Sequence, residues 1–227
     1  MTVTNWILLS ALIIIIVFLI VSYALKKKIL MKSCECLVIP VFGALNVLLL
    51  RNYLPDSLHL IKVSITALSL LTVSTIFISF ESKKILRILG RLISLSSIIC
   101  WIYLYKVIFY IHRVPLWLII SMSALYLACI IITIILSGKQ NLQFYGLFAL
   151  SFTLSSYLHF CSLIFLCYEK SSASILLFSG ATLYLILHAF HFINQAKLQF
   201  KHAGVIRFCL ISASQILIAC SNLMMIS

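Results

Sequence analysis

Four hydroxyl side chains in and just after the stretch ALSLLTVSTIF (67–77) share one predicted helical face. Ser69, Thr72, Thr75 and Ser79 are spaced by three, three and four residues, which places them on one side of a helix. Two roles fit such a strip. It is either a reactive surface or a row of small residues that lets a neighbouring helix approach closely. We favour close packing, because the stretch contains no charged group.

Carboxylates, the usual acid–base groups of hydrolases and proton-coupled transporters, are scarce. The four acidic residues are Glu35, Asp56, Glu81 and Glu169. We expect all four at helix ends and none at mid-membrane. An ionisable group within the hydrocarbon region usually marks a functional site, so this distribution disfavours a small transporter and a hydrolase with paired acids. Pro40 and Pro115 are expected near helix starts, where proline leaves a helix unbroken, and this also disfavours a transporter built on broken helices.

Neutral polar side chains within the apolar segments are the remaining candidates for a binding pocket. They are Asn46, Thr72, His159, Thr182, His188 and Gln215. Asn46, Thr182 and Gln215 each lie about ten to twelve residues into their segments, near one membrane depth. The alternative for each residue is a single interhelical hydrogen bond, which contributes about 0.6 kcal/mol on average, and we favour that alternative for any one of them.

No metal or cofactor is expected. His188 and His191 form the pair HAFH, but no HExxH glutamate or nearby aspartate supplies the general base of a zinc hydrolase. Cys34 and Cys36 form a CxC at an expected helix start, without the second pair of ligands that a structural zinc site needs. Nucleotide-binding glycine motifs and a GxSxG elbow are also missing from the sequence.

The high hydrophobic and low charged content of the chain indicates a membrane protein, in which polar residues are uncommon. The chain is 64% hydrophobic and 9% charged over 227 residues, whereas soluble domains average about 25% charged residues. A spanning helix needs about 20 mostly apolar residues. We therefore predict an all-α integral membrane protein in which residues 1–227 form a single eight-helix domain. The predicted helices cover residues 4–25, 34–51, 57–80, 88–110, 114–137, 141–168, 171–193 and 203–226.

Charge predicts the orientation of these helices. Alternate connections on one side carry twelve basic residues: Lys26, Lys27, Lys28, Lys32, Lys83, Lys84, Arg87, Arg91, Lys139, Lys197, Lys201 and Arg207. The other side carries five: Arg51, Lys62, Lys106, Arg113 and Lys170. Because cytoplasmic loops are enriched in Lys and Arg, we predict both termini outside the cytoplasm. The opening MTVTNW has no positive charge, and no small-residue cleavage site precedes the lysines, so we expect the first helix to be retained. The net charge of +13 then indicates contact with anionic lipid head groups, and no nucleic-acid partner is expected.

Several short motifs, in order along the chain, resemble those of the YhhN-like lysoplasmalogenase family. They are ECLVIP (35–40), LSLLTV (68–73), LGRLISLSSIICWIYLY (89–105), ASILLFSGAT (173–182) and SASQILI (212–218). Pro40, Gly90, Tyr103 and Gln215 match the family's pattern. The resemblance implies an eight-helix membrane fold and hydrolysis of the vinyl ether bond of a lysoplasmalogen.

Two positions at which the sequence differs from the family pattern change the activity that we expect. The two aspartates of the family pattern fall on Val73 and Thr182, and neither side chain can supply the acid that protonates a vinyl ether. We therefore expect a divergent, lipid-binding member of the inner (plasma) membrane with weak or no hydrolysis, whose ligand is a membrane lipid such as a lysophospholipid. The alternative is an active lysoplasmalogenase or a related lysophospholipid hydrolase, with the acid–base role moved to His188, His159 or Glu35.

Overall fold

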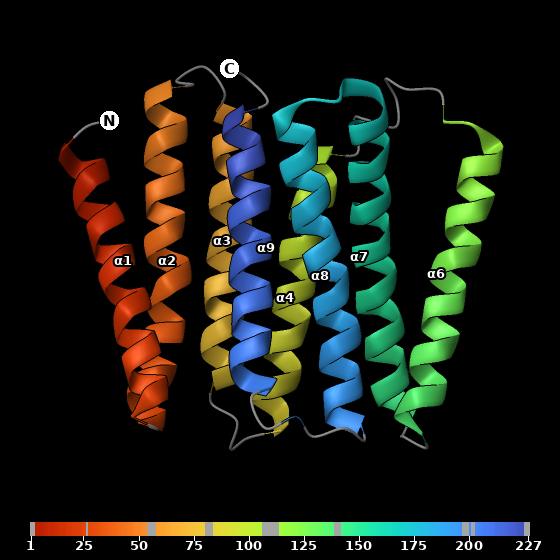
Figure 1. The fold of residues 1–227 in the computed structure, drawn as a ribbon, viewed down its shortest axis with the longest axis horizontal. Coiled ribbons are helices and arrows are strands. Elements are labelled where there is room, and N and C mark those ends of the chain that lie inside the picture. Colours follow the sequence, from red (N-terminus) through yellow and green to blue (C-terminus); the bar gives the residue numbers. More distant parts are fainter. Residues whose placement is uncertain are drawn as a thin grey trace. The chain divides into compact units, whose positions relative to one another are not determined.

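Eight helices make up the secondary structure of the described part of the chain (Figure 1). The computed structural model describes residues 3–25, 27–53, 58–79, 84–105, 114–138, 142–196, 200 and 203–224. The helices are α1 (Val3–Ala24), α2 (Lys28–Tyr53), α3 (Leu58–Ser79), α4 (Lys84–Tyr105), α6 (Leu116–Ser137), α7 (Leu142–Glu169), α8 (Ser172–Ala196) and α9 (Ala203–Met224). Each is long and apolar enough to span a membrane, so the predicted all-α fold of eight spans is confirmed.

The helices extend further into the basic connections than the sequence analysis predicted. α2 begins at Lys28 instead of residue 34, α4 begins at Lys84 instead of residue 88, and α8 continues to Ala196 instead of ending at 193. Lysine, arginine, glutamine and alanine favour helix formation, and the long side chains of lysine and arginine can reach the membrane surface from a helix end. The predicted ends of the fourth and last helices, at residues 110 and 226, lie outside the described residues.

The earlier start of α2 overturns three local expectations. Cys34, Glu35 and Cys36 lie between six and eight residues past the first residue of the helix instead of at its start. Glu35 is buried and belongs to a segment that is apolar enough to span the membrane. Pro40 lies in the helix interior, whereas Pro115 immediately precedes α6, as expected. Not all acidic residues are therefore at helix ends.

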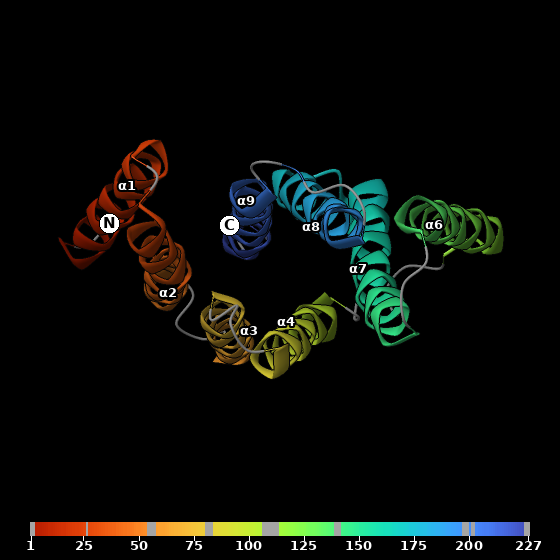
Figure 2. The same ribbon diagram turned by 90° about the horizontal axis from the view of Figure 1, so that it is seen from below.

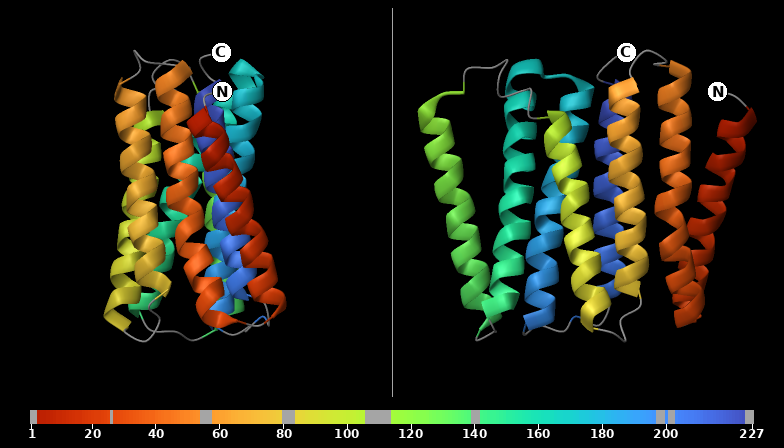
Figure 3. Two further views of the ribbon diagram at one scale, coloured as in Figure 1. Left: turned by 90° about the vertical axis from the view of Figure 1, so that its left-hand side faces the viewer. Right: turned by 180° about the vertical axis from the view of Figure 1, so that it is seen from behind.

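The chain divides into two compact units, and the boundary follows Trp101 near the end of α4. In the first unit, α2 packs on α1 and on α3, and consecutive helices run antiparallel (Figure 3). A Cβ atom added to Gly90 of α4 would lie 2.8 Å from Ile78 Cγ1 and 3.1 Å from the Ser74 carbonyl oxygen of α3. The Ser97 hydroxyl donates a hydrogen bond of 2.9 Å to the Ala67 carbonyl. Close approach at these residues holds α3 and α4 together.

The contact with α4 lies on a different face of α3 from Ser69 and Thr72, and the close-packing role of the hydroxyl strip of residues 69–79 stays a prediction. Helix α3 meets α4 through the face of Ala67, Ser74 and Ile78, not through the face that Thr72 shares with Ser69. Ser69 is exposed, and the Thr72 hydroxyl donates to the Leu68 carbonyl of its own helix at 2.9 Å. Because a serine or threonine hydroxyl can bond within its own helix, the Thr72 hydroxyl does not need a hydrogen-bond partner on a neighbouring helix.

In the second unit, α8 lies between α9 on one side and α7 on the other (Figure 2). A Cβ atom added to Gly180 of α8 would lie 2.9 Å from both the Ser214 carbonyl oxygen and Ile218 Cγ1 of α9. On the side of α8 that faces α7, Phe192 stacks on Phe148, with ring centroids 3.9 Å apart. The absence of a side chain at Gly180 thus allows α8 and α9 to pack closely.

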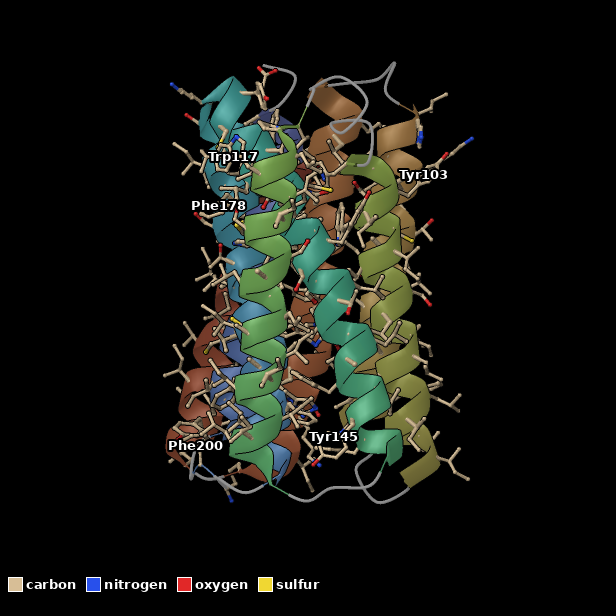
Figure 4. All side chains as sticks on the ribbon, turned by 90° about the vertical axis from the view of Figure 1, so that its right-hand side faces the viewer. Tyr103, Trp117, Tyr145, Phe178 and Phe200 are labelled. Atoms are coloured by element: carbon tan, nitrogen blue, oxygen red, sulfur yellow. The ribbon has the colours of Figure 1, made fainter. Side chains whose placement is uncertain are left out.

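An aromatic cluster, formed by Phe148, Phe152 and Phe192, is the centre of packing between α6, α7 and α8. Partly buried residues pack around it: Tyr126, Cys129, Ile130, Ile134, Phe144, Tyr145, Leu185 and Ala189. Helix α6 contributes four of these, and its remaining surface is largely exposed and apolar. Trp117 and Phe178 lie toward one end of this unit, and Tyr145 and Phe200 toward the other (Figure 4). Aromatic residues at both ends are typical of membrane-spanning helices.

Candidate functional site

The predicted pocket residues, together with Val73 at the other position of a family aspartate, are divided between the two units. Asn46, Thr72 and Val73 belong to the first unit, and His159, Thr182, His188 and Gln215 to the second. Asn46 and Gln215 are buried, Thr72 is half-buried, and Val73 is 40% exposed. Among these residues, the structure brings His159 and Thr182 into contact.

His159 is the centre of a hydrogen-bonded chain across three helices. Its Nδ1 atom lies 2.7 Å from the Tyr126 hydroxyl of α6, and its Nε2 atom lies 3.1 Å from the Thr182 hydroxyl of α8. The His159 side chain is buried. Its ring also meets Phe178 at a centroid distance of 5.0 Å. Tyr126, which the sequence analysis did not single out, completes the site.

We assign the direction of this chain from its hydrogen-bond partners, for a neutral imidazole. The Thr182 hydroxyl donates its proton to the Phe178 carbonyl at 2.7 Å, so its oxygen accepts a hydrogen bond from His159 Nε2–H. In a neutral imidazole the other nitrogen, Nδ1, is then an acceptor. Tyr126 therefore donates its proton to His159. The order is Tyr126 to His159 to Thr182 to a backbone carbonyl.

The three side chains lie at one depth. Tyr126 and Thr182 are each ten residues after the first residue of their helices, and His159 is ten residues before the last residue of α7. At 1.5 Å per residue this is about 15 Å from the same end of the unit, near the middle of a hydrocarbon layer about 30 Å thick. Polar side chains at this depth are costly unless they are paired or functional.

The geometry favours binding and orientation over acid catalysis. A proton moving along the chain would end at the Phe178 carbonyl, which cannot pass it on. Both nitrogens of His159 are already engaged. The Tyr126 oxygen, at the head of the chain, can still accept a hydrogen bond, because a phenol that donates its proton keeps its acceptor capacity. The site can therefore orient a ligand that carries a hydrogen-bond donor.

Comparison with known proteins gives no family assignment. No family model, no curated protein and no solved structure matches the chain. The resemblance to YhhN-like lysoplasmalogenases is therefore an expectation from the motifs. The structure by itself establishes a multi-pass membrane protein with eight candidate spans.

His188 and Gln215 are the other two candidate residues of the second unit. His188 follows Thr182 by six residues, which places it on a different face of α8, and its ring meets Tyr184 edge-on at 5.0 Å. Its Nε2 atom is buried without a hydrogen-bond partner. Gln215 lies on α9, one residue after Ser214, which packs at Gly180.

A second polar cluster, also missed by the sequence analysis, joins the end of α4 to the end of α9. The buried Tyr105 hydroxyl donates to Asn222 Oδ1 and lies 3.0 Å from the Ser221 hydroxyl oxygen. Ser221 in turn donates to the Ile218 carbonyl at 2.8 Å. The only signal in the sequence was the pair Ser221–Asn222 close to the end of an apolar segment. We interpret this cluster as helix-to-helix bonding.

The described residues contain no group of three or more His, Cys, Asp or Glu side chains that could hold a metal ion. Cys34 is buried, Cys36 is partly exposed, and neither forms a disulfide. Asp56 and Glu81 lie outside the described residues, and Glu169 is exposed at the end of α7. Glu35 is the one buried carboxylate in the described part of the chain.

Proposed function

We propose that this multi-pass membrane protein is a divergent YhhN-like protein that binds a lipid such as a lysophospholipid and has weak or no vinyl-ether hydrolase activity. The main support is Thr182. It stands where the family pattern has an aspartate, and its hydroxyl is engaged with His159 at 3.1 Å and with its own helix at 2.7 Å. Threonine keeps the polar contact but cannot supply the acid.

Val73, at the second position where the family pattern has an aspartate, supports the same proposal. Val73 on α3 is an apolar side chain, 40% exposed, and so has no proton to give. Protonation of a vinyl ether carbon needs a strong, positioned acid. A site that keeps hydrogen-bonding groups and lacks that acid is suited to holding a lipid.

The direct test is an assay with lysoplasmenylethanolamine as substrate. Purified protein should release no aldehyde above the level of a heat-inactivated sample, and native mass spectrometry should detect a co-purified lipid. The double variant Val73→Asp, Thr182→Asp restores both acids of the family pattern, and gain of aldehyde release would support the family assignment. Robust turnover by the unmodified chain would contradict the proposal.

The second candidate is an active lysoplasmalogenase or lysophospholipid hydrolase, and the burial of Glu35 favours it. A carboxylate inside a candidate span is an unusual group and could act as a general acid. The variant Glu35→Gln keeps the shape of the side chain and removes its acidity. Turnover that is present in the unmodified protein and lost in Glu35→Gln would establish this second candidate. Loss in His159→Gln but not in Glu35→Gln would assign the role to His159.

A further inference from the structure

We propose that α6 is a lateral gate of the second unit, which turns about its Gly138 end and is held closed by the hydrogen bond between Tyr126 and His159. Opening of the gate lets a lipid chain in the bilayer reach the polar side chains of α7 and α8. This inference rests on the proposed lipid-binding function, because it gives the route by which a lipid enters. Its basis is the way in which α6 is attached to the rest of the unit.

Helix α6 packs on the unit through the second half of its length. The residues that it places around the aromatic cluster are Tyr126, Cys129, Ile130 and Ile134. Between residues 116 and 125 no side chain is buried, and all but two are exposed. The ribbons of α6 and α7 approach each other where α6 ends and diverge toward its start (Figures 1 and 3). Only 6% of the α6 span is buried, the smallest share among the eight candidate spans, so this helix is the one most weakly held.

The end of α6 is fixed to α7 at Gly138. The Tyr145 hydroxyl of α7 donates a hydrogen bond to the Gly138 carbonyl. The Tyr145 ring in turn lies against Phe192 of α8, with ring centroids 6.1 Å apart. Gly138 has a φ of 70°, in the left-handed region that glycine enters without a steric penalty. A conformationally free residue beside an anchored carbonyl is suited to a change in the direction of the helix that precedes it.

The hydrogen bond of 2.7 Å between Tyr126 and His159 Nδ1 is the interaction that holds the remainder of α6 in place. Lipid tails are as apolar as the side chains of α6, so no hydrophobic driving force opposes separation of this helix from the aromatic cluster. Lipid tails cannot replace a hydrogen bond, and its loss leaves two polar groups unpaired. The Tyr126–His159 bond is therefore the latch of the gate.

Opening about Gly138 displaces the two ends of α6 by different amounts. Tyr126 lies about 18 Å from Gly138 along the helix, at 1.5 Å per residue. Room for one hydrocarbon chain requires Tyr126 to withdraw by about 4 Å, the contact distance between two carbon atoms. If α6 turns as a rigid rod, Ile120, about 27 Å from Gly138, moves by about 6 Å, and Ile135, about 4.5 Å from Gly138, moves by about 1 Å.

The test is double electron–electron resonance between nitroxide labels on the full chain, with its eight native cysteines replaced by alanine, in nanodiscs of dioleoylphosphatidylcholine. The gate pair is Ile120→Cys with Ile175→Cys of α8. The pivot pair is Ile135→Cys with Leu150→Cys of α7. These four side chains are 48–72% exposed, so the labels displace no packed residue.

Tyr126→Phe keeps the ring and removes the latch. We expect a gate-pair distance longer by about 6 Å, with a population raised about fivefold, as for the loss of one hydrogen bond between membrane helices. The pivot-pair distance should change by less than about 2 Å. Thr133→Val is the matched control, because it removes a hydroxyl of α6 that bonds to the Cys129 carbonyl of the same helix, and both distances should stay unchanged.

A second measurement uses the chain that retains Tyr126, so it does not depend on how well a variant folds. Addition of lysophosphatidylethanolamine to these nanodiscs should raise the population of the longer gate-pair distance, because a chain that enters holds α6 open. The pivot pair should again stay in place. The shorter distance should return when the lipid is removed by exchange into fresh nanodiscs.

Three results would overturn the inference, each in a different part. Gate-pair distances that Tyr126→Phe leaves unchanged would exclude the latch. Equal displacement of both pairs would show that α6 separates as a whole and would exclude the pivot at Gly138. Absence of a response to the lipid would exclude the role in lipid entry. Native mass spectrometry for a co-purified lipid tests the proposed function separately, so a bound lipid beside an unmoved α6 would reject the gate alone.

Discussion

His159 Nε2 lies 3.1 Å from the Thr182 hydroxyl oxygen, and this contact joins α7 to α8 near the middle of the unit. Thr182, at a position where the proposed family resemblance expects an aspartate, is thus a hydrogen-bond acceptor. The same imidazole ties α6 to this pair through Tyr126. Three helices are therefore connected through one side chain, and stability measurements can test each connection.

Thr182→Val removes the acceptor of His159 Nε2–H while keeping the size of the side chain. We expect a loss of about 1 kcal/mol in the free energy of unfolding, within the range measured for hydrogen bonds between membrane helices. Unfolding by SDS in mixed micelles measures it. Thr182→Ser, which keeps the hydroxyl, should lose less. Thr66→Val is the control, because Thr66 is exposed and bonds only to the Lys62 carbonyl of its own helix; an equal loss there would contradict this prediction.

Tyr126→Phe and His159→Phe should show strong coupling in a double-mutant cycle. Each single change leaves a polar partner unsatisfied in a buried site, whereas the double change removes both partners. We expect the double variant to be more stable than the sum of the single losses predicts, by about 0.5–2 kcal/mol. Additive effects, measured by the same unfolding assay, would mean that the 2.7 Å contact contributes nothing.

Gly180→Ala should destabilise the second unit. The added Cβ would lie 2.9 Å from the backbone oxygen of Ser214 and 3.1 Å from the backbone nitrogen of Ile218, and backbone atoms cannot move aside without shifting α9. We expect a loss of about 1–3 kcal/mol, typical of overpacking. Gly146→Ala is the matched control, since no atom lies within 4 Å of its added Cβ. Alanine favours helix over glycine by about 1 kcal/mol, so this control should gain stability.

Tyr105→Phe should weaken the attachment of the end of α4 to α9. The change removes the hydroxyl that donates to Asn222 Oδ1 and leaves that buried oxygen without its Tyr105 partner. We expect a loss of about 1–2 kcal/mol in unfolding free energy. Adding Asn222→Leu to Tyr105→Phe should recover part of that loss. A double variant less stable than the single one would show that Asn222 is needed for another reason.

The orientation of the chain is testable by reporter fusions. Alkaline phosphatase folds only outside the cytoplasm, so a fusion after residue 227 should be active and a fusion after residue 140 inactive, if the positive-inside rule holds for the twelve-to-five charge bias. Green fluorescent protein at the same two positions should give the reverse pattern. Active phosphatase at residue 140 would reverse the predicted orientation.

The membrane class and the eight spans could be predicted from the sequence because both depend on local properties. A run of about 20 apolar residues must pair its backbone within its own helix to cross a bilayer, whichever helices surround it. Helix ends were less predictable. α2 begins at Lys28 because helix-favouring residues continue past the apolar run, and this extension is what placed Glu35 inside the helix.

Which polar side chains meet was decided by the tertiary structure. His159 and Thr182 were both candidates, but their contact depends on the rotation and vertical register of α7 and α8, which no single segment encodes. Tyr126 lies 33 residues from His159 in the chain and resembles any aromatic residue in an apolar run. The hydroxyl of Thr72 shows the converse, because bonding within its own helix removes any need for a partner. The length of an apolar run can be read from one segment of the sequence. A site forms only when several helices pack together, so its residues depend on the tertiary structure.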